Sequence, residues 1–376
     1  MHLISQNKNS IPEFEDIFSF ESILESFNEF KRNKKYKNDV VAFSMNLIGN
    51  LFSLHNDLMS GVYKHGGYRH FKISDPKPRD IHKASVRDRI VHHCIYRSLY
   101  PHFNRYFVHD SYSCRFEKGT HKAVRRFESF GRKESKNNTK TIWALKGDIK
   151  KCFASVDHDI LKLVLRNYLR CDKILNITGS IIDSFNSGFS GSGIPLGNLT
   201  SQLFINIYLN EFDQFMKREL KTKFYIRYAD DFIVLSRDKD YLWELVPKIA
   251  DFLGEELKLS LHPNKLFVKT LASGVDFLGW IQFPNHRVLR TSTKNRVFKK
   301  LEKEFKKETV ASYLGMLKYG NTFKLSEKIR GKNSDVVIHN HFVDTNEMVQ
   351  IGSGAERSIK THKNTSCCFC NSFSAI

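Results

Sequence analysis

Apolar residues recur at helical spacing in four segments of the chain and predict helices there. Residues 13–60 form two amphipathic stretches joined by a basic run, which indicates a helical extension at the amino end. The same spacing is found in 161–169 and again in 205–216. The stretch 293–307 sets an apolar face against many lysines, which is typical of a helix that lies against nucleic acid.

Short apolar runs between the helices predict strands. The run 142–145 leads to Asp148 and is followed by a helical pattern, so a strand precedes a helix. Two more strands are predicted at 224–228 and 232–236, joined by a tight turn. The Ser- and Gly-rich segment 184–193 predicts a flexible loop between the helix expected at 161–169 and the helix expected at 205–216.

The charge balance points to a polyanionic partner. The 376 residues include 60 Lys and Arg against 40 Asp and Glu, a net charge of +20. A hydrophobic fraction of 41% is enough to bury a core, so the chain is expected to fold as two or three domains. Basic and aromatic side chains dominate 61–133, which favours a phosphate-facing surface over a core there.

Nothing in the sequence indicates a membrane protein. No segment approaches the roughly 20 apolar residues of a membrane span, and 1–16 is acidic where a signal peptide is apolar. We therefore expect a cytoplasmic protein. Ser, Asn, His and Gly dominate 331–376, and the cysteines of 367–370 lack a second ligand pair at zinc spacing, so a loosely ordered or appended tail is expected.

Two adjacent carboxylates, Asp230 and Asp231, lie at the tight turn between the predicted strands. Burying adjacent like charges is costly unless a cation compensates them, and hard oxygen ligands suit Mg²⁺. An exposed Asp-rich turn is the alternative interpretation. Asp148, at the end of another apolar strand, supplies a third carboxylate and favours the metal site.

Such a site suits nucleotidyl transfer. Two metal ions about 3.5–4 Å apart would activate a primer 3′-hydroxyl and neutralise the leaving pyrophosphate. Phe153, five residues after Asp148, would then lie beneath the incoming sugar and exclude a 2′-hydroxyl. An ordinary core Phe is the alternative for this position.

These segments resemble the palm of reverse transcriptases, because the Asp148 strand, the loop before the next helix and the Tyr228-Ala229-Asp230-Asp231 hairpin follow in the family's order. The resemblance covers roughly residues 70 to 330. It implies an α+β right-hand polymerase with fingers, a palm of antiparallel sheet plus helices, and a helical thumb. The segment His262-Pro263-Asn264-Lys265 is similar to the motif that follows the hairpin in the family.

Within the family, the segment Ile194-Pro195-Leu196-Gly197-Asn198-Leu199-Thr200-Ser201-Gln202 resembles the diversity-generating retroelement subgroup. The resemblance implies that a template-repeat RNA is copied into cDNA with errors at template adenines, followed by transfer into a variable gene, called mutagenic retrohoming. Leu196 stands where most bacterial relatives have Gln, and losing that polar contact near the templating base predicts lower fidelity.

The resemblance also assigns roles to single residues. Metal ligation falls to Asp148, Asp230 and Asp231 with the backbone of Ile149, using two Mg²⁺ ions with Mn²⁺ as an alternative. Lys265 is expected to donate a proton to pyrophosphate, with an exposed Lys as the alternative. The other assigned residues bind substrate (Arg79, Arg87, Arg89, Phe153, Leu196, Gly197, Gln202, Lys265) or form the primer grip (Phe277, Leu278, Gly279, Trp280). For the three arginines, solvated surface charge is the alternative.

The expected organisation and partners follow from the same resemblance. The segments are a helical extension at 1–60, fingers at 61–147, a palm at 148–285, a thumb at 286–330 and the tail. The expected partners are template RNA, a DNA primer or cDNA, deoxynucleoside triphosphates and a small basic accessory protein. Two alternatives stay open: a reverse transcriptase of a phage-defence or group II intron lineage, and a non-catalytic RNA-binding or maturase-like protein.

Overall fold

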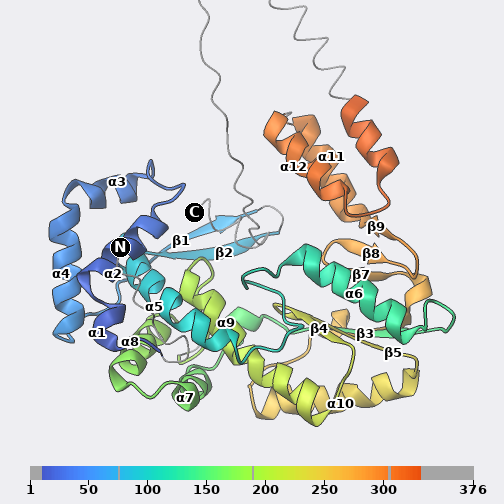
Figure 1. The fold of residues 1–376 in the computed structure, drawn as a ribbon, viewed down its shortest axis with the longest axis horizontal. Helices are drawn as coiled ribbons and strands as arrows, with labels where there is room; N and C mark the ends of the chain where they lie inside the picture. The colour runs from blue at the N-terminus through green and yellow to red at the C-terminus, as the bar shows by residue number, and fades with distance from the viewer. Residues whose placement is uncertain (1–10, 75–76, 189, 304–305, 332–376) are drawn as a thin grey trace, which may run out of the picture.

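A four-stranded antiparallel sheet is the largest sheet in the described part of the computed structural model, which describes residues 11–74, 77–188, 190–303 and 306–331 (Figure 1). The strand order is β4 (Tyr225–Tyr228), β5 (Asp231–Ser236), β3 (Trp143–Asp148) and β6 (Phe267–Thr270). The three strands predicted from the apolar runs are confirmed as β3, β4 and β5.

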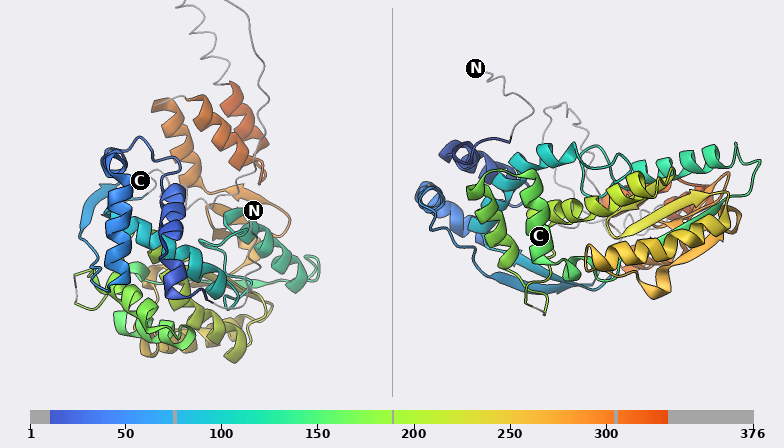
Figure 2. Two further views of the ribbon diagram at one scale, coloured as in Figure 1. Left: turned by 60° about the vertical axis from the view of Figure 1, so that its left-hand side comes forward. Right: turned by 90° about the horizontal axis from the view of Figure 1, so that it is seen from below.

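Helices cover both faces of this sheet. Leu145, Phe232 and Val234 face a core shared with α9 (Leu199–Gln214) and α10 (Lys239–Glu255), and α10 lies across the sheet when the molecule is seen from below (Figure 2). On the other face, residues such as Ala144 and Ile233 pack with α6 (Thr120–Glu134) in a second core. Alternate side chains of each strand therefore enter different cores, as the pleat requires.

Gly147 permits the close packing of β3 on β5. A Cβ atom at this position would lie 2.2 Å from Cζ of Phe232, which is fully buried. We expect Gly147→Ala to lower the free energy of unfolding by about 1–3 kcal/mol, because the Phe232 ring would have to move in a packed core. Urea unfolding measures this, with Gly254→Ala as the control because its Cβ would meet nothing within 4 Å. Equal losses in both variants would contradict the packing argument.

The amino-terminal region is helical, but it contains four helices where the periodicity predicted two. They are α1 (Phe14–Ile17), α2 (Phe20–Phe30), α3 (Asn38–Met45) and α4 (Leu47–Met59). Ser19 starts α2 as a cap by accepting a hydrogen bond from the Ser22 amide, and Asn46 leaves the helical conformation between α3 and α4. Local capping, which hydrophobic spacing does not reveal, divides the two stretches.

Helix α5 (Val86–Asn104) packs against α2 within the first core. The prediction that 61–133 forms a surface rather than a core is therefore wrong for this helix. Its apolar residues lie on one buried side: Ile90, Val91, Cys94, Ile95 and Leu99. Basic residues dominate the composition between them, and two of these, Arg89 and His92, are themselves buried.

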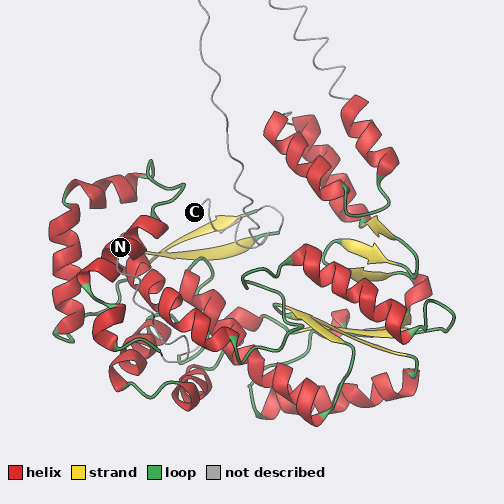
Figure 3. Cartoon of the chain, viewed as in Figure 1, coloured by secondary structure: helices red, strands yellow, loops and turns green. Residues whose placement is uncertain are grey.

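The β1–β2 hairpin (Tyr68–Ile73 and Arg79–Ala84) is antiparallel and docks on the loop that precedes α9. The Asn198 side chain donates to the His82 carbonyl at 2.8 Å and accepts from the Ala84 amide at 3.2 Å. The helices α7 (His158–Tyr168) and α8 (Asp172–Asp183) complete this helix-rich side (Figure 3). The segment 184–193 contains no helix or strand where it is described.

The carboxy-terminal part begins with a three-stranded sheet and continues as helices. The strands are β7 (Val275–Phe277), β8 (Trp280–Gln282) and β9 (Arg287–Leu289), followed by α11 (Thr291–Lys303), α12 (Lys307–Leu317) and a helical segment at 323–331. The predicted basic helix corresponds to α11. The predicted tail, including its cysteines, lies outside the described residues from 332 onward. Short single-turn elements are Cys152–Ser155, Phe215–Glu219, Pro263–Lys265 and Leu271–Ser273.

A ring stack joins the carboxy-terminal helices to the rest of the molecule. Tyr319, just after α12, stacks on His121 of α6 with ring centroids 3.7 Å apart. Its neighbour Gly320 lies against Trp280, because a Cβ there would come within 2.1 Å of that ring.

None of the helices in the described ranges combines the length and apolar character needed to cross a bilayer.

Candidate active site

The three predicted carboxylates come together at one end of the central sheet. Asp148 ends β3 and lies directly opposite Asp231, the first residue of β5. Asp230 occupies the turn between β4 and β5, and its carbonyl accepts a hydrogen bond from the Ile149 amide at 3.1 Å. Ile149 therefore ties the end of one strand to the turn of the hairpin.

Two lysines only partly offset the charge of these carboxylates. Lys265 Nζ lies 2.9 Å from Asp148 Oδ1, and Lys146 Nζ lies 3.7 Å from Asp231 Oδ1. Burial raises the pKa of both Asp230 and Asp231, and the neighbouring carboxylates raise it further. Burial alone would lower the pKa of Lys265, but contact with Asp148 raises it overall.

The donor chemistry fits a divalent cation. All three side chains offer hard oxygen ligands, and burial, together with the neighbouring carboxylates, raises the pKa of Asp230 and Asp231. In the described part of the chain, no group of three His, Cys, Asp or Glu side chains already converges on one metal position. Lys265 instead holds the Asp148 oxygen that a cation would contact.

A buried ion pair fixes the turn that carries Asp230. The guanidinium of Arg227 donates to Asp213 on α9, with Nε to Oδ1 at 2.7 Å and Nη2 to Oδ2 at 2.6 Å. Its remaining nitrogen, Nη1, donates to the carbonyl of Ala229 at 3.0 Å, and Ala229 adopts a left-handed φ of 53°. Arg227 thus links the helix beneath the sheet to a strained residue adjoining Asp230.

Sequence reasoning missed this pair, although a signal was present. Arg227 lies in the otherwise apolar strand Tyr225–Tyr228, and Asp213 is a charged residue on α9, most of whose residues are buried. Both side chains are essentially inaccessible to solvent. Opposite charges in two buried elements predict a pair, since buried charges need partners.

The segment 109–115 supports the same strand from its other edge. The Arg227 amide donates to the Asp110 carbonyl, and the Tyr112 amide donates to the Arg227 carbonyl, both at 3.0 Å. The hydroxyl of Thr120, at the start of α6, donates to the Tyr228 hydroxyl at 3.2 Å. Main-chain pairing and side-chain contacts therefore enclose the residues before Asp230.

The three predicted phosphate-binding arginines occupy different surroundings. Arg79, at the start of β2, acts through its charge on Asp230 and opposes part of the rise in the pKa of that carboxyl. Arg87 instead contacts Asp57 at 2.5 Å, and the buried Arg89 pairs with Asp39. The structure brings only Arg79 toward the carboxylates and engages the other two with acidic residues of the amino-terminal helices.

The predicted template loop connects the site to the β1–β2 hairpin. The Leu196 carbonyl accepts from the His82 amide at 2.9 Å. Gly197 has a φ of 114°, and a Cβ there would lie 2.8 Å from Cγ2 of Ile81. Gln202 is buried in the first part of α9. The half-buried Phe153 accepts a hydrogen bond from the Ile194 amide at 2.8 Å, so it adjoins this loop.

The four predicted primer-grip residues form the tight β7–β8 turn. Leu278 and Gly279 have φ values of 53° and 86°, which is typical of a two-residue hairpin connection. Phe277 and Trp280 are buried beneath them in the second core.

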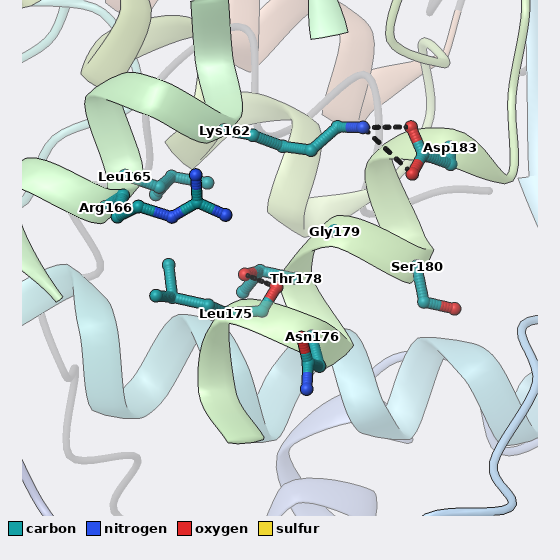
Figure 4. A pocket seen from close by; sticks show the side chains of 9 residues that line it. All are labelled: Lys162, Leu165, Arg166, Leu175, Asn176, Thr178, Gly179, Ser180 and Asp183. Carbon is teal, nitrogen blue, oxygen red and sulfur yellow. Dashed lines mark hydrogen bonds and ion pairs between the residues drawn. The ribbon is translucent and has the colours of Figure 1, made fainter. Parts of the chain in front are cut away.

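A separate pocket between α7 and α8 (Figure 4) is lined by none of the predicted site residues, and its Lys162 is paired with Asp183 at 2.8 Å.

Comparison with known proteins gives consistent results. Residues 71–282 match the protein family described as reverse transcriptase (RNA-dependent DNA polymerase). Protein YkfC of Escherichia coli is 26% identical over 306 residues, covering 70% of this chain and 78% of YkfC. The group II intron-encoded protein LtrA of Lactococcus lactis is 22% identical over 295 residues, covering 60% of this chain and 47% of LtrA.

A solved structure confirms the fold. Telomerase from Candida albicans, determined with a fragment of telomeric RNA, superimposes with a TM-score of 0.53 at 12% identity. The superposition covers 76% of this chain and 56% of the telomerase chain. The predicted α+β right-hand polymerase architecture is therefore confirmed, while the chain spans about half the length of LtrA and of this telomerase.

Proposed function

Because the chain belongs to the reverse transcriptase (RNA-dependent DNA polymerase) family, we propose that it copies a template RNA into cDNA by two-metal nucleotidyl transfer. The enzyme class is RNA-directed DNA polymerase, a nucleotidyltransferase. The observation that supports the proposal is the placement of Asp148, Asp230 and Asp231 at the same end of one sheet. In this proposal 61–147 are the fingers, 148–285 the palm and 286–330 the thumb.

The chain's own residues would prepare the reaction as follows. Asp148, Asp230 and Asp231 would hold two Mg²⁺ ions, with Mn²⁺ as an alternative, and the ions supply Lewis-acid stabilisation of the attacking and leaving oxygens. Arg79 would bind triphosphate oxygens. Lys265, whose pKa is raised beside Asp148, stays protonated near neutral pH and would give its proton to the departing pyrophosphate.

Metal addition gives a test that does not depend on turnover. We expect saturating MgCl₂ to raise the melting midpoint of the protein by about 2–6 °C, because the ion binds the folded state and relieves repulsion among the carboxylates. Thermal melting with MgCl₂ and with excess EDTA measures this. Asp251→Asn, on the exposed side of α10, should keep the shift, and Asp230→Asn should lose it. A shift of equal size in both variants would place the ion elsewhere.

The finer proposal is an error-prone enzyme of a diversity-generating retroelement. It is supported by Leu196 in the loop that contacts the β1–β2 hairpin through His82. We expect wild-type cDNA to carry substitutions mainly opposite template adenines, and Leu196→Gln to reduce them several-fold, because a polar side chain near the templating base discriminates its geometry. Sequencing of primer-extension products measures both, with Leu196→Met as the matched control. Faithful wild-type cDNA would contradict the proposal.

The partners and the lineage belong to the same proposal. A template RNA, a DNA primer, deoxynucleoside triphosphates and a small basic accessory protein complete the system. The similarity to LtrA supports a second candidate, an enzyme of a group II intron lineage, and faithful cDNA would favour that lineage or phage defence. Loss of Asp230 without loss of function in the cell would favour a non-catalytic RNA-binding or maturase-like protein instead.

A further inference from the structure

A basic pocket lies beside the carboxy-terminal half of α6, away from the carboxylates. Its volume is about 520 Å³, and it lies between α6, the residues before β4 and the residue after β5. We call it the α6 pocket. Its basic side chains are Arg126, Lys133, Lys136, Lys223 and Arg237.

The acidic residues of the α6 pocket do not neutralise these cations. Asp110 is held by Arg126 at 2.7 and 3.4 Å, and Glu134 accepts from the main chain and side chain of Arg237 at 3.0 and 3.4 Å. Each carboxylate is thus matched by one arginine. Within the ranges that the structure describes, the exposed Lys133, Lys136 and Lys223 have no ion pair, and the pocket keeps three unmatched positive charges.

Aromatic rings hold part of this charge in place. The Arg126 guanidinium lies over the Phe130 ring at 4.4 Å, and Lys223 Nζ lies over the Phe224 ring at 5.3 Å. The two rings pack edge to face with centroids 5.2 Å apart, and both are buried. Cation–π contacts of this kind restrict where the charged groups lie before a ligand binds.

The turn after α6 is also fixed to the body of the molecule. Lys136 has a left-handed φ of 50°, and the hydroxyl of Ser135 accepts from the Asn138 amide at 2.8 Å. The Asn138 side chain donates to the Asn285 side chain at 2.7 Å. Lys136 therefore projects from an anchored turn and not from a free loop.

The position of the α6 pocket separates it from the reacting strand. Asp231 begins β5 and Arg237 follows its end, so at about 3.3 Å per residue the Arg237 side of the pocket lies about 20 Å from the carboxylates, while its Asp110 side lies nearer to them. The start of α6 contacts Tyr228, whereas the pocket adjoins the helix's other end. A nucleotide being copied cannot reach both places at once.

We propose that the α6 pocket binds backbone phosphates of a folded RNA segment outside the copied stretch of template. Unmatched lysines and a guanidinium suit phosphate oxygens, and the overall charge of +20 attracts a long polyanion. The proposal rests on the proposed use of an RNA template and names how that RNA is held. Phosphate contacts give affinity and orientation without reading sequence, so the folded shape of the RNA would determine which segment fits.

The test compares two triple variants with equal loss of charge. One is Lys133→Gln/Lys136→Gln/Lys223→Gln, and the control removes three exposed lysines elsewhere: Lys35→Gln, Lys64→Gln and Lys248→Gln. Filter binding to a folded, hairpin-containing transcript is measured over a range of salt concentrations. Extension of a short unstructured RNA–DNA primer–template is measured in parallel, and thermal melting checks that each variant is folded.

The expected result is weaker binding of the folded transcript by the pocket variant, with a salt slope about 2 to 3 units shallower than wild type. The control should bind nearly as wild type, and both should extend the short primer–template at the wild-type rate. Equal weakening in both variants, unchanged binding, or loss of short-template extension in the pocket variant alone would overturn the proposal. Absence of extension by the wild type would instead contradict the proposed function, because transcript binding is measured without catalysis.

Discussion

Replacing Asp230 by Asn is expected to reduce primer extension by about 10³-fold or more while leaving the fold intact. Asn keeps the size of the side chain but removes a charged metal ligand from the site formed with Asp148 and Asp231. Single-nucleotide incorporation on a defined RNA template with Mg²⁺ measures the loss.

The same change should not destabilise the protein. The pKa of Asp230 is raised in the folded state, so above that pKa the ionised carboxylate opposes folding. Removing its charge should therefore leave the melting midpoint equal or higher in metal-free buffer. Asp251→Asn is the control for both measurements, and we expect it to change neither. A stable, fully active Asp230→Asn protein would refute the assignment of this carboxylate.

Replacing Arg227 by Met is expected to lower the free energy of unfolding by about 3–5 kcal/mol, because the buried carboxylate of Asp213 would lose its charged partner. Tyr225 would still donate to that carboxylate at 2.7 Å, but a hydroxyl does not neutralise it. Activity should fall as well, since Arg227 also donates to the carbonyl of Ala229. Urea unfolding and primer extension measure the two losses separately.

The double variant Asp213→Leu/Arg227→Met separates stability from positioning. An apolar pair of similar volume often replaces a buried ion pair at little cost, so most of the stability should return. Activity should not return, because nothing would hold the Ala229 carbonyl and its left-handed backbone beside Asp230. Recovery of activity together with stability would show that the pair serves the fold alone.

The sequence predicted the sheet and its carboxylates because both depend on local pattern. Short apolar runs identify β3, β4 and β5, and the turn between β4 and β5 places Asp230 and Asp231 next to each other whatever surrounds them. Their meeting with Asp148 depends on strand order, which the resemblance supplied. The register of β3 against β5 then sets Asp148 opposite Asp231.

Long-range partners could not be predicted in the same way. Arg87 and Arg89 lie 30 and 50 residues along the chain from their partners, Asp57 and Asp39. Composition cannot show that these two arginines contact carboxylates of the amino-terminal helices. Nor can it show that, of the three predicted arginines, Arg79 is the one whose charge acts on Asp230. The pairing of Arg227 with Asp213 differs, because the two residues are 14 positions apart and each is a charge within an otherwise buried element, so the sequence did carry a signal for it.

The stack of Tyr319 on His121 has a consequence for how far the enzyme would travel in one encounter. His121 directly follows Thr120, which contacts Tyr228, so the turn after α12 and the hairpin that carries Asp230 are joined through two adjacent residues. In the proposed polymerase, a thumb anchored there would keep its distance from the growing duplex as each nucleotide is added. Processivity would thus depend on the contact between two aromatic rings.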